Sequence, residues 1–313
     1  MKEAFRTKLG MSKSNVERLN TINEILEEYR QQSFILTLRQ LYYQLVSREI
    51  ISNNQKEYAK LSILLTKGRM AGIVDWGAIE DRGRSPKIPF SIDGVQQALD
   101  VIADQYRIDR QDGQENYIEV WVEKDALSNV FARVTEPYHI RLMVNKGYSS
   151  SSAMYEAASR FKNAYRRNGQ EGILLYFGDH DASGKDMVRD VEERLREMGV
   201  KSLQVINPAL TMEQINEYDP PENPAKQTDP RSKWYIEKYG DSSWELDALP
   251  PQVLMQIVRD NVIQWMDLNK FQEVRVKEAN QKKVITEYAS NYVEREDDFD
   301  EDIELDDETD FEF

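Results

Sequence analysis

Two separate acidic segments contain side chains suited to hold a metal ion. The apolar run YIEVWVE ends at Glu123, and ILLYFGDHDASG places Asp179 and Asp181 after a second apolar run. Both runs are typical of buried strands, and the carboxyl ends of parallel strands meet at the sheet edge where α/β folds bind ligands. We therefore expect Glu123, Asp179 and Asp181 to hold Mg²⁺, or Mn²⁺, through oxygen ligands. The alternative is an exposed strand end and an ordinary Asp-rich turn.

A further acidic pair is a candidate for metal binding, and a neighbouring loop contains glycines as phosphate-binding loops do. The segment WELDALPP supplies Glu245 and Asp247, which are candidates for a second metal position or, alternatively, caps for the following helix. The loop GDHDASGKD resembles a phosphate-binding loop only superficially. Its glycine spacing is wrong, and Asp186 stands where a Ser or Thr must bind magnesium, so we reject that assignment.

Two adjacent tyrosines differ in their predicted environments. At about 100° per residue, Tyr42 falls inside the apolar stripe of a helix, whereas Tyr43 lies roughly 130° from its centre. We therefore expect Tyr42 in the core and Tyr43 accessible, one turn after Arg39. A tyrosine hydroxyl attacks a phosphodiester when its proton is removed and the developing charge is neutralised, as an arginine and a metal would do. The alternative is that Tyr43 is an ordinary surface residue.

Basic side chains supply candidate contacts to a DNA backbone, the alternative being a solvated basic face. The candidates are Lys67, Arg69, Arg82, Arg84, Lys146 and Lys185. Residues 1–90 contain 15 Lys and Arg against 10 Asp and Glu, a net charge of +5. This charge permits phosphate binding without establishing it.

The N-terminal pattern predicts three helices followed by a β-rich segment. Ser14 is the expected cap of the first helix, Thr37 caps the second, and a third is expected over about residues 55–70. The segment 73–89 mixes β-forming residues with glycine and proline, as a small wing does. Three short helices and a wing predict a winged helix-turn-helix domain.

The rest of the chain alternates between strand and helix patterns. This alternation predicts an α/β domain with a parallel sheet. A linking helix over 94–107 and a proline-rich loop over 217–230 flank this pattern, and Pro250 and Pro251 suit the start of one long final helix. We expect strands at 117–123, 139–144, 172–178 and 202–206, and helices at 124–134, 151–167 and 184–198.

Composition limits the classes of protein to consider. The 313-residue chain has no cysteine and two histidines, which excludes disulfides and cysteine or histidine-cluster metal sites. No apolar run approaches the roughly 20 residues that span a bilayer, and the first residues do not resemble a secretion signal, so we expect a cytoplasmic protein. Residues 294–313 contribute −12 of the net charge of −15 and predict a disordered acidic tail.

Three motifs together resemble a known domain. The runs VEKDALSNVF (122–131), VNKGYSS (144–150) and YFGDHDASGKDM (176–187) resemble the toprim domain of the topoisomerase VI A subunit and of its relative, the meiotic double-strand-break transesterase. Upstream, TLRQLYYQLVSR (37–48) resembles the winged-helix segment of that family, in which the second of two adjacent aromatic residues is the nucleophile. That position is Tyr43.

The resemblance implies both a domain organisation and an activity. The resemblance covers about residues 33–250, and with the patterns above it predicts a winged-helix DNA-binding domain at 1–93, a linker helix at 94–116, a toprim domain with a helical extension at 117–293 and the acidic tail at 294–313. Magnesium-dependent cleavage of double-stranded DNA would follow, with Tyr43 attacking and Arg39 assisting. In that family the tyrosine and the metal come from different protomers of a homodimer, and an ATPase subunit is a partner.

Some features depart from the family pattern and leave alternatives open. The turn 144–150 has no proline, His180 and Ala182 stand in the aspartate loop, and nothing in the chain resembles an ATPase or its docking segment. One alternative is a toprim nuclease that hydrolyses DNA with a metal-activated water. A second is a non-catalytic DNA-binding regulator.

Overall fold

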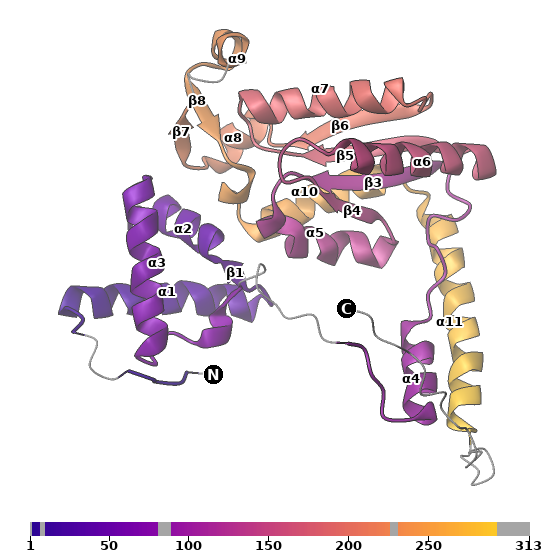
Figure 1. Cartoon of the computed structure of the whole chain (residues 1–313), viewed down its shortest axis with the longest axis horizontal. Helices are drawn as coiled ribbons and strands as arrows, with labels where there is room; N and C mark the ends of the chain where they lie inside the picture. Colours follow the sequence, from indigo (N-terminus) through magenta and orange to yellow (C-terminus); the bar gives the residue numbers. More distant parts are fainter. Residues whose placement is uncertain (1, 7–9, 81–88, 226–230, 293–313) are drawn as a thin grey trace, which may run out of the picture. The chain divides into compact units, whose positions relative to one another are not determined.

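The computed structural model describes residues 2–6, 10–80, 89–225 and 231–292. The chain divides into two units, Met1–Ser85 with Gln111–Leu268 and Pro86–Arg110 with Asn269–Phe313. The first unit contains N-terminal helices and a parallel sheet, and the described residues of the second contain two helices (Figure 1). Within the described residues, no helix combines the length and apolarity needed to cross a membrane. The cytoplasmic location stays a prediction.

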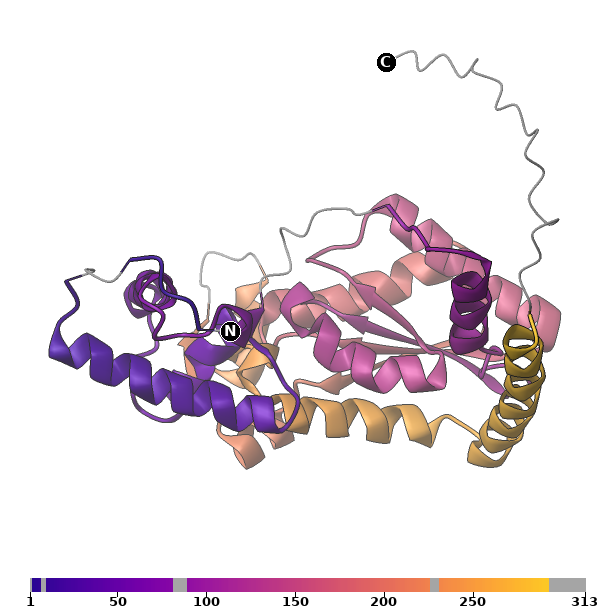
Figure 2. The ribbon, with the colours of Figure 1, turned by 90° about the horizontal axis from the view of Figure 1, so that it is seen from below.

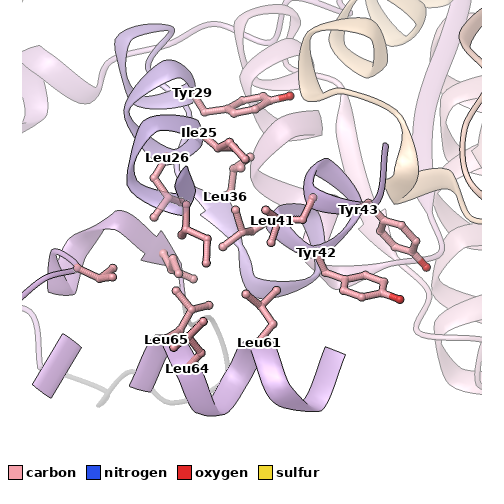
Figure 3. Packing of buried hydrophobic residues seen from close by; sticks show 14 of the residues in the cluster. Ile25, Leu26, Tyr29, Leu36, Leu41, Tyr42, Tyr43, Leu61, Leu64 and Leu65 are labelled. Atoms are coloured by element: carbon pink, nitrogen blue, oxygen red, sulfur yellow. The ribbon is translucent and has the colours of Figure 1, made fainter. Parts of the chain in front are cut away.

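Three helices form the N-terminal part of the first unit, as predicted. They are α1 (Lys13–Gln31), α2 (Leu38–Ser47) and α3 (Gln55–Met70). Thr37 caps α2, and Gln40 completes the capping box. The cap of α1 is Ser12 rather than Ser14, because the Ser12 side chain accepts the Asn15 N–H. Leucines, isoleucines and tyrosines of all three helices pack into one core (Figure 3).

The expected wing is only partly visible in the described residues. After the short helix η1 (Trp76–Ala78), strand β2 (Ile79–Glu80) pairs with β1 (Leu36–Thr37). This pair is parallel, whereas strands joined by a tight hairpin are antiparallel. Residues 81–88 of the expected wing lie outside the described part of the chain. The winged-helix assignment therefore stays a proposal.

A four-stranded sheet forms the centre of the first unit, and its strands are all parallel. Its order is β4-β3-β5-β6. The predicted α/β class is confirmed, and β3 and β5, which precede the acidic motifs, are neighbours. The strands are β3 (Asn116–Val122), β4 (Arg141–Val144), β5 (Glu171–Phe177) and β6 (Leu203–Ala209).

Helices cover both faces of this sheet. Successive residues of a strand point to opposite faces, so each face presents apolar side chains to the helices on its side. Tyr117 and Trp121 of β3 pack in one core with Phe161 of α6. Phe177 of β5 faces the other side, where its ring centroid lies 4.9 Å from that of Phe131 of α5. Seen from below, α5 and α10 lie in front of the strands and α6 and α7 behind them (Figure 2). These helices are α5 (Ser128–Thr135), α6 (Ser151–Asn168), α7 (Ala182–Glu197) and α10 (Pro251–Gln264).

Shorter elements follow the last sheet strand. The prediction of a loop over 217–230 is wrong at β7 (Glu222–Pro224), which pairs antiparallel with β8 (Ser242–Trp244). Residues 226–230 of that loop lie outside the described part. The remaining short helices are η2 (Asp125–Leu127), η3 (Glu136–Tyr138), α8 (Met212–Tyr218), α9 (Ser232–Tyr239) and η4 (Leu246–Ala248).

The second unit pairs α4 (Val95–Gln105) with α11 (Leu268–Ser290). The Gln96 side chain donates to the Ala289 carbonyl at 3.0 Å, and the Glu278 carboxylate accepts from Arg110 at 2.5 Å. One long final helix was predicted, and this is wrong, because α10 ends at Gln264 and α11 starts at Leu268. The acidic tail, residues 294–313, lies outside the described residues.

Candidate metal and nucleophile site

The site lies at the carboxyl ends of β3 and β5. The chain leaves β3 toward α5 on one face of the sheet and leaves β5 toward α7 on the other. Such a switch point opens a crevice in which α/β folds bind ligands. Glu123 directly follows β3, and its N–H donates to the carbonyl of Phe177, the last residue of β5, at 2.9 Å. The two predicted acidic motifs therefore share one sheet edge.

Glu123 and Asp179 are in direct contact at this edge. The Asp179 N–H donates to Glu123 Oε2 at 3.2 Å. Asp181 points its Oδ1 at the start of α7, where it accepts from the Gly184 N–H at 2.7 Å and the Ser183 hydroxyl at 2.9 Å. Asp181 is thus the N-cap of α7, and that oxygen already has two donors. Glu123 and Asp179 therefore meet, but within the described residues the predicted trio does not form a group of close ligand oxygens, and Asp181 caps a helix instead.

A tighter carboxylate cluster joins Asp179 to the acidic pair from the distant WELDALPP segment. One ligand oxygen each of Asp179, Glu245 and Asp247 lies within 4.8 Å of the others. The Leu246 N–H donates to Asp179 Oδ1 at 2.8 Å, which ties η4 to the end of β5. No side chain caps α10, so the capping alternative for Glu245 and Asp247 is wrong. Carboxylate oxygens of this kind fit Mg²⁺ or Mn²⁺ by their chemistry.

Two cationic side chains hold this carboxylate cluster. The Lys124 ammonium lies 2.9 Å from both Asp179 Oδ1 and Asp247 Oδ1 and also pairs with Glu245 Oε2. Arg39 donates from Nε to Asp247 Oδ2 at 2.7 Å and from Nη2 to Glu245 Oε2 at 2.6 Å. The structure therefore links the N-terminal helix α2 directly to the sheet edge.

Tyr43 lies beside this network and is buried, which corrects the expectation that it is accessible. Its exposed fraction is 4%, close to the 5% of Tyr42. Arg39 Nη2 donates to the Tyr43 hydroxyl at 3.4 Å, and the guanidinium also lies 5.6 Å from the centroid of its ring. The expectation of an accessible Tyr43 came from the geometry of α2 alone and did not include η4, which packs against this helix. Figure 3 shows both tyrosines projecting from α2.

The pKa values of the site do not all shift in the same direction. Those of Asp179, Glu123 and Tyr43 are raised, and that of Glu245 is lowered. Burial raises the pKa of Asp179 and of Glu123. Burial also opposes ionisation of Glu245, but Lys124 and Arg39 outweigh it and lower the pKa of Glu245 to about 2. For Tyr43, burial raises the pKa, and Glu245 and Asp247 raise it further. Tyr43 therefore needs a change in its surroundings before it ionises.

Within the described residues, the predicted DNA contacts differ in their exposure and in their partners. Lys67 is exposed on α3, but Arg69 donates to the Ile79 carbonyl at 3.0 Å. Lys146 is exposed and lies 3.4 Å from a carboxylate oxygen of Asp125. Lys185 turns inward, donating to Asn207 Oδ1 at 2.8 Å and to the Leu210 carbonyl at 2.9 Å. Arg82 and Arg84 lie outside the described residues.

Sequence reasoning did not assign a role to Lys124 or His180. Lys124 directly follows Glu123 in the VEKDA segment, and this position next to a predicted metal ligand could have marked it as a residue of the site. His180 is 1% exposed, and its Nδ1 lies 2.7 Å from the Tyr235 hydroxyl, within a cluster of aromatic rings. Burial lowers the pKa of His180 to about 4. The ring therefore supports the aspartate loop as a neutral group.

Comparisons with known proteins add no further assignment. No protein-family model matches the chain, and no curated protein matches it significantly.

Proposed function

We propose that this protein is a magnesium-dependent DNA-cleaving enzyme in which Tyr43 attacks a phosphodiester of double-stranded DNA. One observation carries the proposal. Arg39 contacts the Tyr43 hydroxyl and, through the same guanidinium, the carboxylates of Glu245 and Asp247. A candidate nucleophile, a charge-neutralising arginine and a candidate metal cluster thus meet in one unit of the chain.

The proposed reaction is a transesterification. The Tyr43 oxygen forms a bond to phosphorus, the phenolic proton passes to a base, and the deoxyribose oxygen leaves and takes up a proton. Asp179, Glu245 and Asp247 would hold the metal, with Glu123 and Asp181 at the same edge, and the metal would neutralise charge on the scissile phosphate. Arg39 would stabilise the tyrosyl oxygen as its negative charge develops.

A hydrolytic nuclease is the second candidate, and a specific observation favours it. Tyr43 is buried, and its pKa is raised by that burial. A nucleophile with these properties must become exposed before it attacks, whereas a water at the acidic cluster needs no such change. In the hydrolytic mechanism, the Tyr43 hydroxyl accepts a hydrogen bond from Arg39 and does not react.

We propose that α1, α2 and α3 form a winged-helix DNA-binding domain, that the sheet and its helices form a toprim domain, and that the cytoplasmic protein acts as a homodimer. In this structure Tyr43 lies near carboxylates of its own chain. An exchange of tyrosines between protomers is therefore not required to bring the two together. The family resemblance also points to an ATPase subunit as a partner, which the proposal includes.

The test uses supercoiled DNA, Mg²⁺ and a denaturing gel, run with and without protease. Tyr43→Phe should abolish protease-sensitive tyrosyl-DNA adducts while leaving DNA binding intact. Tyr42→Phe is the matched control, since Tyr42 is equally buried but donates to Asn53 rather than contacting Arg39. Cleavage products without protein in both the wild type and Tyr43→Phe would identify hydrolysis. Uncut circles with every protein would support the non-catalytic regulator.

A further inference from the structure

We propose that Lys124 is a built-in cation that holds the acidic cluster in the metal-free protein and is displaced when a divalent metal binds. This inference rests on the proposed metal-dependent function and adds to it a control of metal entry. It assigns a role to a side chain that the proposed reaction does not use.

The position of the Lys124 ammonium carries the inference. It lies 2.9 Å from Asp179 Oδ1, 2.9 Å from Asp247 Oδ1, and pairs with Glu245. These three residues are also the ones whose ligand oxygens gather within 4.8 Å. Because Mg²⁺ needs its oxygen ligands at about 2.0–2.1 Å, a metal and the ammonium cannot share this space. Binding of the metal therefore requires the lysine to leave.

The charges favour an exchange rather than an addition. With all three carboxylates ionised, as ligands of a divalent ion must be, the cluster with Lys124 and Arg39 carries a net charge of −1. Replacement of the ammonium by a divalent ion would bring the cluster to neutrality. Keeping both cations would place a third positive centre beside Arg39, and unpaired like charges at short range are costly in a buried site.

The two cations differ in how easily they can leave. Lys124 has a flexible stem with a single ammonium at its end, so the ammonium can swing out while the backbone stays in place. That backbone is anchored because the Leu127 N–H donates to the Lys124 carbonyl at 3.1 Å. Arg39 instead binds two carboxylates with a planar fork, which fixes its orientation. We therefore expect Lys124 to move and Arg39 to remain beside Tyr43.

Binding of Mn²⁺ to the full chain, measured by the loss of the free-ion electron paramagnetic resonance signal, tests the exchange. Lys124→Gln should bind Mn²⁺ at least about tenfold more tightly than the wild type, because the metal no longer competes with an ammonium. Lys124→Arg, which keeps the charge, should not show this gain. Lys201→Gln, at an exposed lysine just before β6, is the matched control and should bind as the wild type does.

Thermal unfolding gives a second readout that remains informative if the variant is unstable. In chelator, Lys124→Gln should have a lower Tm than the wild type, because the carboxylates have lost a counter-ion. Mg²⁺ should restore much of that loss, since a ligand that binds only the folded state stabilises it. Recovery of folding on Mg²⁺ addition would support the exchange even for a variant that is unfolded without metal.

The outcomes separate this inference from the proposed function. If the wild type binds Mn²⁺ and Lys124→Gln binds it equally or more weakly, Lys124 is a permanent structural cation and the inference fails while the metal-dependent function stands. If neither protein binds Mn²⁺, both the exchange and the metal-dependent function fail.

Discussion

Arg39 and Asp247 form a direct ion pair across 208 positions of sequence, with Arg39 Nε donating to Asp247 Oδ2 at 2.7 Å. The Asp247 side chain is completely buried, whereas that of Arg39 is 41% exposed. A buried carboxylate depends on its donors, because burial removes the water that would otherwise solvate it. This pair therefore joins helix α2 to the sheet edge and at the same time positions the group beside Tyr43.

Arg39→Gln should destabilise the fold. The substitution removes a charged donor from a buried oxygen of Asp247, and leaving such an acceptor unsatisfied costs about 1–3 kcal/mol. Urea denaturation would measure the loss. Arg39→Lys keeps the positive charge but cannot contact two carboxylates at once. Its free energy of unfolding should therefore lie between those of Arg39→Gln and the wild type. Equal stability of all three proteins would contradict a structural role for the pair.

Gly184→Ala should weaken metal binding without altering a carboxylate. A Cβ at this position would lie 2.3 Å from the Asp179 carbonyl oxygen, so α7 or the aspartate loop must shift. We expect the affinity for Mn²⁺ to fall at least about tenfold, because that shift would displace Asp179, and changes to groups that position a metal ligand cost about 10–100-fold in metal affinity. Gly77→Ala is the control, because its Cβ would meet only Asp75 Oδ1, at 3.6 Å. Unchanged Mn²⁺ binding in Gly184→Ala would show that the loop adapts.

Arg160→Met should destabilise the sheet while leaving the metal site intact. Glu119, fully buried in the middle of β3, accepts from Arg160 Nε at 2.7 Å and from Arg160 Nη2 at 3.0 Å. Removing one partner of a buried ion pair costs about 3 kcal/mol, because the other charge stays buried.

A second substitution makes the Arg160 experiment specific. Adding Glu119→Gln removes the stranded charge, so the double variant should recover part of the lost unfolding free energy. Mn²⁺ affinity should stay at the wild-type value in both proteins. A double variant less stable than Arg160→Met would show that the charge of Glu119 is satisfied by Tyr117 and Trp121 alone.

His180 should make stability depend on pH. Its pKa is lowered by burial from 6.5 to about 4, so between these values the unfolded chain binds a proton that the folded chain does not. Folding stability therefore falls as the pH decreases through this window, by up to about 3 kcal/mol when both pKa values have been passed.

The pH effect is measured as a difference between two proteins, because carboxylates titrate in the same range. In chelator, the stability advantage of the wild type over His180→Phe should shrink as the pH falls from above 6.5 toward 4. Phenylalanine retains the ring packing against Tyr239 but has no proton to bind. A constant difference across this range would mean that His180 keeps an ordinary pKa in the folded protein.

The parallel sheet and the N-terminal helices could be predicted because their signals are local. Apolar runs alternating with helical periodicity predicted the sheet, and Thr37 predicted the start of α2. The shared position of Glu123 and Asp179 followed from the rule that parallel strands end at one edge. The break between α10 and α11 has no glycine or proline to mark it, so the sequence indicated one helix.

The arrangement of the site could not be predicted, because it depends on tertiary packing. Helical geometry predicted an accessible Tyr43, but η4 packs against α2, and Tyr43 is buried in the core that the N-terminal helices share. The sequence also offered no reason to choose Glu245 and Asp247 over Glu123 and Asp181 as the close partners of Asp179. Glu245 and Asp247 reach Asp179 because of the path that the backbone takes after β8, and no short sequence motif predicts that path.

The long separation between Arg39 and the acidic segment has a consequence for biosynthesis. The ribosome adds Arg39 more than two hundred residues before it adds Asp247. Until the segment with Glu245 and Asp247 emerges, a nascent chain can hold α2 and the first strands without the carboxylates that Arg39 contacts. A polypeptide that ends before this segment would therefore leave the Arg39 guanidinium without its two partners and could not assemble the site.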